Sequence, residues 1–392
     1  MTDQLTNTKR IESLDFLKGM IMIIMALDHV RDFFHADAFL YDPTDVTQTN
    51  PILFFTRFIT HYCAPVFVFL AGSSAFFVGR RMSKAQLSVW LLKRGFWLML
   101  VEVIIIKIAF TFKFSFEVTV WQVIWLLGAS MITLAAFIHL PKKLMIAICL
   151  IGIFGHNLLD GYSPDSFSTI WSILHVRGLI NIAGFNIVSA YPMIPWIFVM
   201  ALGYYFGGLY QREFPQMRRL KYLKYVGITS IVLFVIIRFI NIYGDPKPWT
   251  TQDSPIYTFL SFLEVSKYPP SLDYLLITLG PAILLLAFVE NLKGRIHAIV
   301  TMFGRVPLFF YIIHFYLIHF LALIAAVATG FPASSMIVDV FITMSPNLEG
   351  YGFSLWLVYV VWLFVIILLY PVCNWYDIYK RNRREHWWLT YI

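Results

Sequence analysis

Long runs of apolar residues separated by short polar segments dominate this chain. A run of about 18 to 25 apolar residues has the length of a helix that crosses a bilayer. The ten runs of this kind cover residues 14–34, 53–79, 95–113, 118–139, 144–160, 190–210, 224–243, 271–290, 306–329 and 353–373. The pattern therefore predicts an all-α fold, a polytopic membrane bundle of about ten transmembrane helices.

Composition supports this class and excludes a soluble core. Hydrophobic residues make up 59% of the chain and charged residues only 13%, which is the balance of a membrane protein. Cys63, Cys149 and Cys373 all lie inside apolar runs and give no disulfide framework. No repeat or low-complexity linker divides the sequence, so we expect one transmembrane domain over residues 1–392. No small-residue cleavage pattern follows a short apolar stretch at the amino terminus, so the first span is expected to be retained.

The basic residues predict the orientation. Most of the 30 lysines and arginines flank the same ends of the apolar runs, from Lys9 and Arg10 at the start to Lys380, Arg381 and Arg384 near the end. The positive-inside rule then places both termini in the cytoplasm of a multi-pass protein surrounded by membrane lipids. The net charge of +8 follows from this topology and does not indicate a nucleic-acid partner.

Ionisable residues cluster at the outer end of the first run. Asp28, Asp32 and His35 fall at positions i, i+4 and i+7 and so share one helical face, with Arg31 beside them. His29 is offset from this face. Charged groups near lipid are costly unless paired or hydrated, so such a cluster indicates a functional site. The alternative is that Arg31 and Asp32 are ordinary interfacial anchors.

The second run enters from the same outer side and adds Arg57 and His61. The small residues Ala71-Gly72-Ser73-Ser74 follow and predict close helix packing. The longer polar segments, 35–52, 161–189, 244–270 and 330–352, all fall on the outer side. We expect them to form a partial roof where a substrate is recognised. Simple connectors are the alternative.

Five sequence blocks carry a resemblance to a known family. They are RIESLDFLKGMIMIIMALDHVRDFF, THYCAPVFVFLAGSSAFF, YPMIPWIFVMALGYYFGG, KYPPSLDYLLITLGPAILLLA and FGRVPLFFYIIHFYLIH. Together they resemble the heparan-α-glucosaminide N-acetyltransferase-like membrane proteins, and specifically the bacterial branch of these acyltransferases. The resemblance covers nearly the whole chain, with the blocks in the same order.

The resemblance implies a membrane-embedded acyltransferase. Such an enzyme takes acetyl-CoA from the cytoplasm as cosubstrate and acetylates a sugar or glycan acceptor on the far side, here across the bacterial cytoplasmic (inner) membrane. The chain departs from the family at Lys18, where an arginine is expected before Gly19. Lysine keeps the positive charge but lacks a planar bidentate donor. The chain also departs at Asp28-His29, near which the lysosomal enzyme has an asparagine.

Acyl transfer to an amine or hydroxyl requires a base, and histidine is the usual one. The resemblance implies that His35 matches the family's catalytic histidine, which follows the first block. We expect His35 to act as general base or transient acetyl acceptor, with Asp28 supporting it as the carboxylate of a triad does. His29 is the competing base. Direct transfer and an acetyl-enzyme both remain open.

Further candidates fall into two groups. For the phosphates of coenzyme A we expect a cationic cytoplasmic surface, to which we assign Arg305 and Lys18. Tyr311 and His314 lie three residues apart on one helical face and resemble the Tyr-x-x-His element of other membrane O-acyltransferases. They are assigned to the donor as well, although a histidine in an aromatic helix is often only a packing residue. Arg31, Arg57, His61 and Lys267 are assigned to the acceptor.

The sequence contains no metal-binding motif, and it leaves one other function class open. No HExxH or CxxC motif is present and the ten histidines are scattered, so no metal cofactor is expected. A proton-coupled transporter or flippase is the alternative function, because buried Asp, His and Arg groups also serve proton relays. The halves of the chain show no internal similarity of the kind many transporters have. The sequence leaves open the acceptor, N- against O-acetylation, and whether the chain forms a homodimer.

Overall fold

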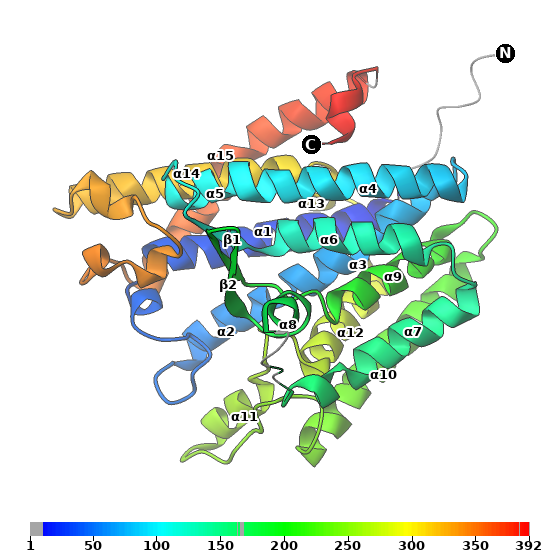
Figure 1. Ribbon diagram of the computed structural model, residues 1–392, viewed down its shortest axis with the longest axis horizontal. Coiled ribbons are helices and arrows are strands. Elements are labelled where there is room, and N and C mark those ends of the chain that lie inside the picture. The colour runs from blue at the N-terminus through cyan, green and yellow to red at the C-terminus, as the bar shows by residue number, and fades with distance from the viewer. Residues whose placement is uncertain (1–10, 163, 165–167, 384, 392) are drawn as a thin grey trace.

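The computed structural model describes residues 11–162, 164, 168–383 and 385–391. Lys9, Arg10 and Arg384, which entered the prediction of orientation, lie outside the described residues. The protein is a bundle of helices with a small sheet at one side (Figure 1).

The elements are as follows. The longer helices are α1 (Glu12–Phe34), α3 (Cys63–Gly79), α4 (Lys84–Leu100), α6 (Val123–Phe137), α7 (Lys142–Gly155), α9 (Trp196–Phe206), α10 (Gln216–Ile240), α12 (Leu272–Val289), α13 (Arg295–Arg305), α14 (Pro307–Ala328) and α15 (Leu355–Asn382). The shorter helices are α2 (Pro51–Thr60), α5 (Lys107–Thr111), α8 (Ser168–Leu174) and α11 (Pro255–Leu263), with a π-helical turn, Val101–Ile106, between α4 and α5. The strands are β1 (Val118–Trp121), β2 (Gly178–Ile182) and β3 (Phe185–Ser189).

Each of the ten predicted runs contains a helix, but not every one is shown to cross a membrane. Six helical segments of the described chain are long and apolar enough to do so: Pro51–Gly79, Lys142–Leu159, Gln216–Ile240, Leu272–Val289, Pro307–Ala328 and Leu355–Asn382. The mostly helical class is confirmed. The number of ten spans stays a prediction.

Helix α1 has the length of a span, at 23 residues, but is unusually rich in charge. It carries Glu12, Asp15, Lys18, Asp28, Arg31 and Asp32. Its position explains how these are tolerated, because α1 runs through the interior of the bundle and contacts α2, α3, α12, α13, α14 and α15 (Figure 1). Neighbouring helices thus shield its polar face from lipid.

The expectation of a purely α-helical fold is wrong in one detail. Residues 118–121, predicted as the start of a helix, form strand β1, which pairs in parallel with β3; β3 pairs antiparallel with β2. Thr119 and the β-branched residues around it favour a strand over a helix here. The segments 161–189 and 244–270, predicted as loops, also contain α8, β2, β3 and α11.

The second run is interrupted and then packs closely, as its small residues predict. The chain leaves α2 after Thr60 and re-enters a helix at Cys63, with Pro65 in the first turn of α3. A side chain at Gly72 would lie 2.0 Å from the carbonyl oxygen of Met200 in α9, so only glycine fits there. The hydroxyl of Ser73 donates to the carbonyl of Gly203 at 2.9 Å. The predicted close packing of this stretch is confirmed.

Helices α1 and α15 lie side by side and antiparallel. The end of α1 meets the start of α15 through backbone hydrogen bonds from Phe353 to Phe34 and from Ala36 to Phe353. About three helical turns away, the indole of Trp362 donates to the carbonyl of Ile23 at 2.8 Å. The start of α1 and the end of α15 therefore face the same side of the bundle. Which side of the membrane this is stays a prediction.

Candidate active site

Asp28 is the centre of a buried ion-pair cluster between α1 and α2. Its two carboxylate oxygens each lie 2.6 Å from Nη1 of Arg57. The hydroxyl of Thr60 lies 2.9 Å from Oδ1, and Nη2 of Arg31 lies 2.9 Å from the same oxygen. Two cations and a hydroxyl thus contact the buried carboxylate and compensate its loss of hydration.

Arg57 and Arg31 extend this cluster towards the loop after α1. Nη2 of Arg31 also lies 2.6 Å from Oδ1 of Asp32. Burial raises the pKa of Asp42, but Arg57 and the hydrogen bonds from Thr44 outweigh it and hold that pKa below its usual range. Arg57 of α2 therefore acts electrostatically on Asp42, in the polar segment that follows α1.

His29 and His314 are brought together from α1 and α14. Nδ1 of His29 lies 2.7 Å from Nε2 of His314, and Nδ1 of His314 lies 3.0 Å from the carbonyl oxygen of Phe310. Tyr311 lies beside both, with its ring centroid 5.5 Å from that of His314, as the shared helical face predicts. Two residues assigned to the donor thus touch one assigned to catalysis.

A carbonyl oxygen only accepts hydrogen bonds, and this fixes the tautomers of the pair. Nδ1 of His314 must carry its proton, so Nε2 of neutral His314 accepts. Nδ1 of His29 is then the donor, and Nε2 of neutral His29 carries the lone pair. Among the described residues this Nε2 has no hydrogen-bond partner, so it is available as a base.

His61 and Lys267 lie near the same cluster. His61 is buried, and its Nδ1 has no partner among the described residues. Lys267 acts electrostatically on Asp28, His29 and His61, and its ammonium lies 5.2 Å from the centre of the Tyr268 ring. The residues assigned to the acceptor are therefore assembled around Asp28.

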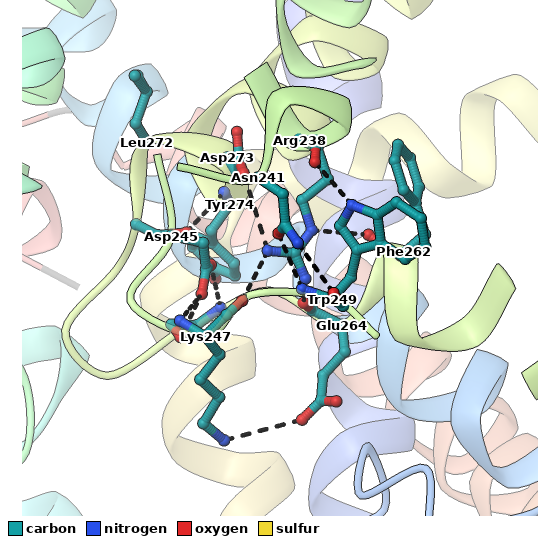
Figure 2. A network of polar contacts seen from close by, with 12 residues as sticks. Arg238, Asn241, Asp245, Lys247, Trp249, Phe262, Glu264, Leu272, Asp273 and Tyr274 are labelled. Atoms are coloured by element: carbon teal, nitrogen blue, oxygen red, sulfur yellow. Dashed lines mark hydrogen bonds and ion pairs between the residues drawn. The ribbon is translucent and has the colours of Figure 1, made fainter. Parts of the chain in front are cut away.

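Arg238 orders the segment that precedes Lys267, and Figure 2 shows its polar contacts. This buried guanidinium donates to four backbone carbonyls, those of Phe262 at 3.0 Å, Lys247 at 2.8 Å, Ser261 at 3.1 Å and Glu264 at 2.5 Å. The carboxylate of Asp245 accepts from the backbone N–H of Ser266 at 2.7 Å, directly before Lys267. The side chains of Arg238 and Asp245 thus fix the backbone conformation of the segment before Lys267.

His35 lies apart from the carboxylate expected to support it. Helix α1 ends at Phe34, and His35 has extended backbone angles, so the predicted helical face does not continue to this residue. The described hydrogen bonds and ion pairs of Asp28 go to Arg57, Arg31 and Thr60. The carboxylate within reach of His35 is instead Asp37, whose Oδ2 lies 4.0 Å from Nε2. The expected contact between Asp28 and His35 is therefore not formed; Asp28 pairs with the two arginines, and Asp37 is the carboxylate near His35.

The two cations assigned to coenzyme A lie towards the other end of α1. The ammonium of Lys18 donates to the hydroxyl of Ser74 at 3.0 Å. The helix with Arg305 packs on the start of α1 so closely that a side chain at Gly304 would lie 1.8 Å from the carbonyl oxygen of Asp15. Arg305 itself lies 2.8 Å from the carboxylate of Asp377. Ten residues of helix, about 15 Å, separate Lys18 from Asp28.

Comparison with known families decides what kind of protein carries this arrangement. The family model described as heparan-alpha-glucosaminide N-acetyltransferase, catalytic, matches residues 10–239, well over half of the chain. The chain belongs to this family. No curated protein matches it.

The family makes the chain a membrane acetyltransferase, and the six apolar helices make it an integral membrane protein. The match includes Lys18, Asp28, His29, Arg31, His35, Arg57 and His61. Lys267, Arg305, Tyr311 and His314 lie beyond the matched residues, although the structure places Lys267 and His314 beside the matched ones. Within the described part of the chain, no group of three His, Cys, Asp or Glu side chains could hold a metal ion.

Several residues of the cluster were not predicted. Thr60 contacts Asp28, and the hydroxyls of Tyr191 and Tyr268 lie 3.1 Å apart. Tyr274 donates to the carbonyl of His61 at 2.8 Å. All four lie in blocks that carry the family resemblance; Thr60 lies inside the second apolar run, near Pro65, and the three tyrosines lie at or near the starts of later runs, close to prolines or polar residues. That position was the available signal, since a tyrosine or threonine in a membrane helix is otherwise an ordinary residue.

Proposed function

We propose that this protein transfers the acetyl group of cytoplasmic acetyl-CoA to an amine or hydroxyl of a sugar or glycan on the extracytoplasmic side of a bacterial inner membrane. The observation that carries the proposal is the buried cluster around Asp28 in a chain of this family. It contains two histidines, His29 and His61, that each have a ring nitrogen without a partner among the described residues. It also contains three cations, Arg31, Arg57 and Lys267. Such groups suit proton removal and the binding of a polar acceptor.

His35 is the first candidate for the base or transient acetyl acceptor. The family resemblance supports it, and so does its position at the end of α1, next to the segment expected to admit the acceptor. Its Nδ1 is buried without a partner among the described residues, and Asp37 lies within 4.0 Å of Nε2. Asp37, whose Oδ2 accepts from the hydroxyl of Tyr41 at 2.8 Å, acts on His35 electrostatically, while Asp28 contacts the two arginines.

His29 is the second candidate, and a specific observation favours it. His314 orients its ring through Nδ1, which leaves Nε2 unprotonated and free. This is the arrangement in which a histidine accepts a proton from a nucleophile while a partner holds the ring. Tyr311 and His314 then act through His29 and do not hold coenzyme A.

The donor is assigned to the opposite end of α1. The phosphates of coenzyme A are proposed to bind near Lys18 and Arg305, with the pantetheine arm extending along the bundle towards Asp28. An extended arm of this kind crosses about half of a hydrocarbon core of ~30 Å. The acetyl group would then be presented to an acceptor that arrives from the other side.

The test is acetyl transfer by the purified protein in lipid nanodiscs. Radiolabelled acetyl-CoA is offered with glucosamine, with glucose as a hydroxyl-only control, and with oligosaccharides that contain either sugar. We expect release of coenzyme A and a labelled acetylated sugar, and the preferred acceptor decides between N- and O-acetylation. Proton-coupled uptake of a solute into proteoliposomes, without any acetyl transfer, would instead support the transporter or flippase.

A further inference from the structure

The guanidinium of Arg31 contains hydrogen-bond donors that no described residue of the chain accepts. The residue is 3% exposed. Its Nη2 contacts Asp28 at 2.9 Å and Asp32 at 2.6 Å, whereas Nε and Nη1 are buried without a partner among the described residues. These two nitrogens carry three N–H groups. Leaving a buried donor unpaired is costly, so the donors are expected to serve an acceptor atom that is not part of the chain.

Arg31 is linked to both candidate histidines. Its side chain acts electrostatically on His29 and His35, and on His61, and its backbone carbonyl accepts the N–H of His35 at 2.9 Å. The guanidinium therefore influences either candidate base.

Acetyl transfer creates a negative charge that such donors stabilise. When the acceptor's nitrogen or oxygen bonds to the thioester carbon, its proton passes to the histidine, and the carbonyl electron pair moves onto oxygen. As that pair returns, the carbon–sulfur bond breaks, and the histidine's proton goes to the leaving thiolate, which gives coenzyme A. Preorganised donors aimed at the intermediate oxyanion in a water-poor site lower this barrier.

We propose that Arg31 stabilises the oxyanion of the tetrahedral intermediate through Nε and Nη1, a role that rests on the proposed acetyltransferase function. Its contacts with the two carboxylates position the guanidinium. Asp28 already has Arg57 as its counter-ion, with both oxygens at 2.6 Å, so Arg31 is not needed to neutralise it. The competing explanation is that Arg31 serves only as the counter-ion of Asp32.

Two variants separate these explanations in the full-length protein, with acetyl-CoA and glucosamine as probes. Arg31→Gln is expected to lower kcat by about 10²- to 10³-fold and to leave the calorimetric affinity for acetyl-CoA unchanged. Arg31→Gln combined with Asp32→Asn removes both charges of the pair and is expected to stay as slow. Arg219→Gln is the control, because Arg219 in α10 is a partly buried arginine that pairs with Glu290 at the end of α12, away from the residues assigned to the site. Its turnover per folded molecule should equal that of the wild type.

Chemical rescue provides a readout that a purely structural role would not move. Guanidinium ions added to Arg31→Ala should restore part of kcat in a saturable manner. Recovery of the rate by the Arg31→Gln, Asp32→Asn double variant would show a counter-ion and overturn the proposal, as would a normal kcat with a raised KM for glucosamine. A wild-type protein that releases no coenzyme A would overturn the proposed function itself, and with it this role.

Discussion

His29 and His314, 285 positions apart in the sequence, share a hydrogen bond of 2.7 Å in the interior of the bundle. The second nitrogen of His314 is committed to the carbonyl of Phe310. When both rings are neutral the direction of the bond is therefore fixed, with His29 as donor, and Nε2 of His29 is the nitrogen able to accept a proton. His29 is therefore a second candidate base, in addition to His35, which the family resemblance implies.

Replacing each histidine in turn should identify the base. We expect His35→Ala to lower acetyl transfer by about 10²- to 10⁴-fold, the usual cost of losing a general base, while acetyl-CoA binding and thermal stability persist. His29→Ala and His314→Ala serve as the matched pair and should cost less. If both instead abolish turnover and His35→Ala leaves it intact, the base is His29 and the orienting residue is His314.

Replacing Asp28 should damage the fold more than a simple loss of one hydrogen bond. Asp28→Asn leaves Arg57 and Arg31 without their shared counter-ion in a buried cluster, and breaking such a pair costs about 3–5 kcal/mol. A lowered melting temperature measured in detergent would show this. Adding Arg57→Gln to the same protein should recover part of the stability. A variant of unchanged stability would mean that water compensates the arginines.

Arg305 provides the test of the donor side. Arg305→Ala is expected to weaken acetyl-CoA binding by about 1.5–3 kcal/mol, the contribution of a charge-assisted hydrogen bond, and the difference should shrink at high salt. Arg381→Ala is the control, because Arg381 pairs with the same carboxylate of Asp377 at 3.2 Å but was not assigned to the donor. Equal calorimetric affinities of the wild type and the Arg305 variant would place the phosphates elsewhere.

Arg238 should affect the acceptor without touching it. Its four bonds to backbone carbonyls order the segment that ends at Lys267. Arg238→Ala is therefore expected to raise KM for the sugar more than it lowers kcat, and to speed amide hydrogen exchange in residues 244–270. Arg238→Lys restores one charge but cannot reach four carbonyls, so it should recover little. A change in kcat alone would contradict a positioning role.

The turn at Asp45 should lose stability in acid. Hydrogen bonds from Thr47 lower the pKa of Asp45, outweighing the smaller effect of burial. A carboxyl whose folded-state pKa is depressed contributes stability above its unfolded-state pKa and loses it as the pH falls through the folded value. The protection of the Thr47 amide, measured relative to its intrinsic exchange rate at each pH, is therefore expected to fall below about pH 4, and Asp45→Ala should show low protection at every pH. Protection that does not change with pH in the wild type would contradict this account.

The positions of the helices could be predicted from the sequence, and so could much of the site. Apolar run length is a local property, and each run does contain a helix. The ionisable residues of α1 stand out because their burial is costly, and the small residues at Gly72 indicate close packing. The residues of strand β1 were predicted as the start of a helix because they continue an apolar run. Their β-branched side chains favour a strand only weakly, and the pairing with a strand almost 70 residues later decides it.

Which charges meet was decided by the tertiary structure alone. Helical spacing placed Asp28 and His35 on one face. In the structure α1 ends at Phe34, so His35 lies near Asp37. Asp28 instead pairs with Arg57 of α2. Arg305 was assigned to the phosphates of coenzyme A from its position in the sequence, and in the structure it forms an ion pair with Asp377 of α15. The sequence by itself determined the helical membrane class, the family resemblance and the residue types of the site. Their pairing required the packing of helices, because a side chain's partner in a bundle lies across space and has no fixed spacing along the chain.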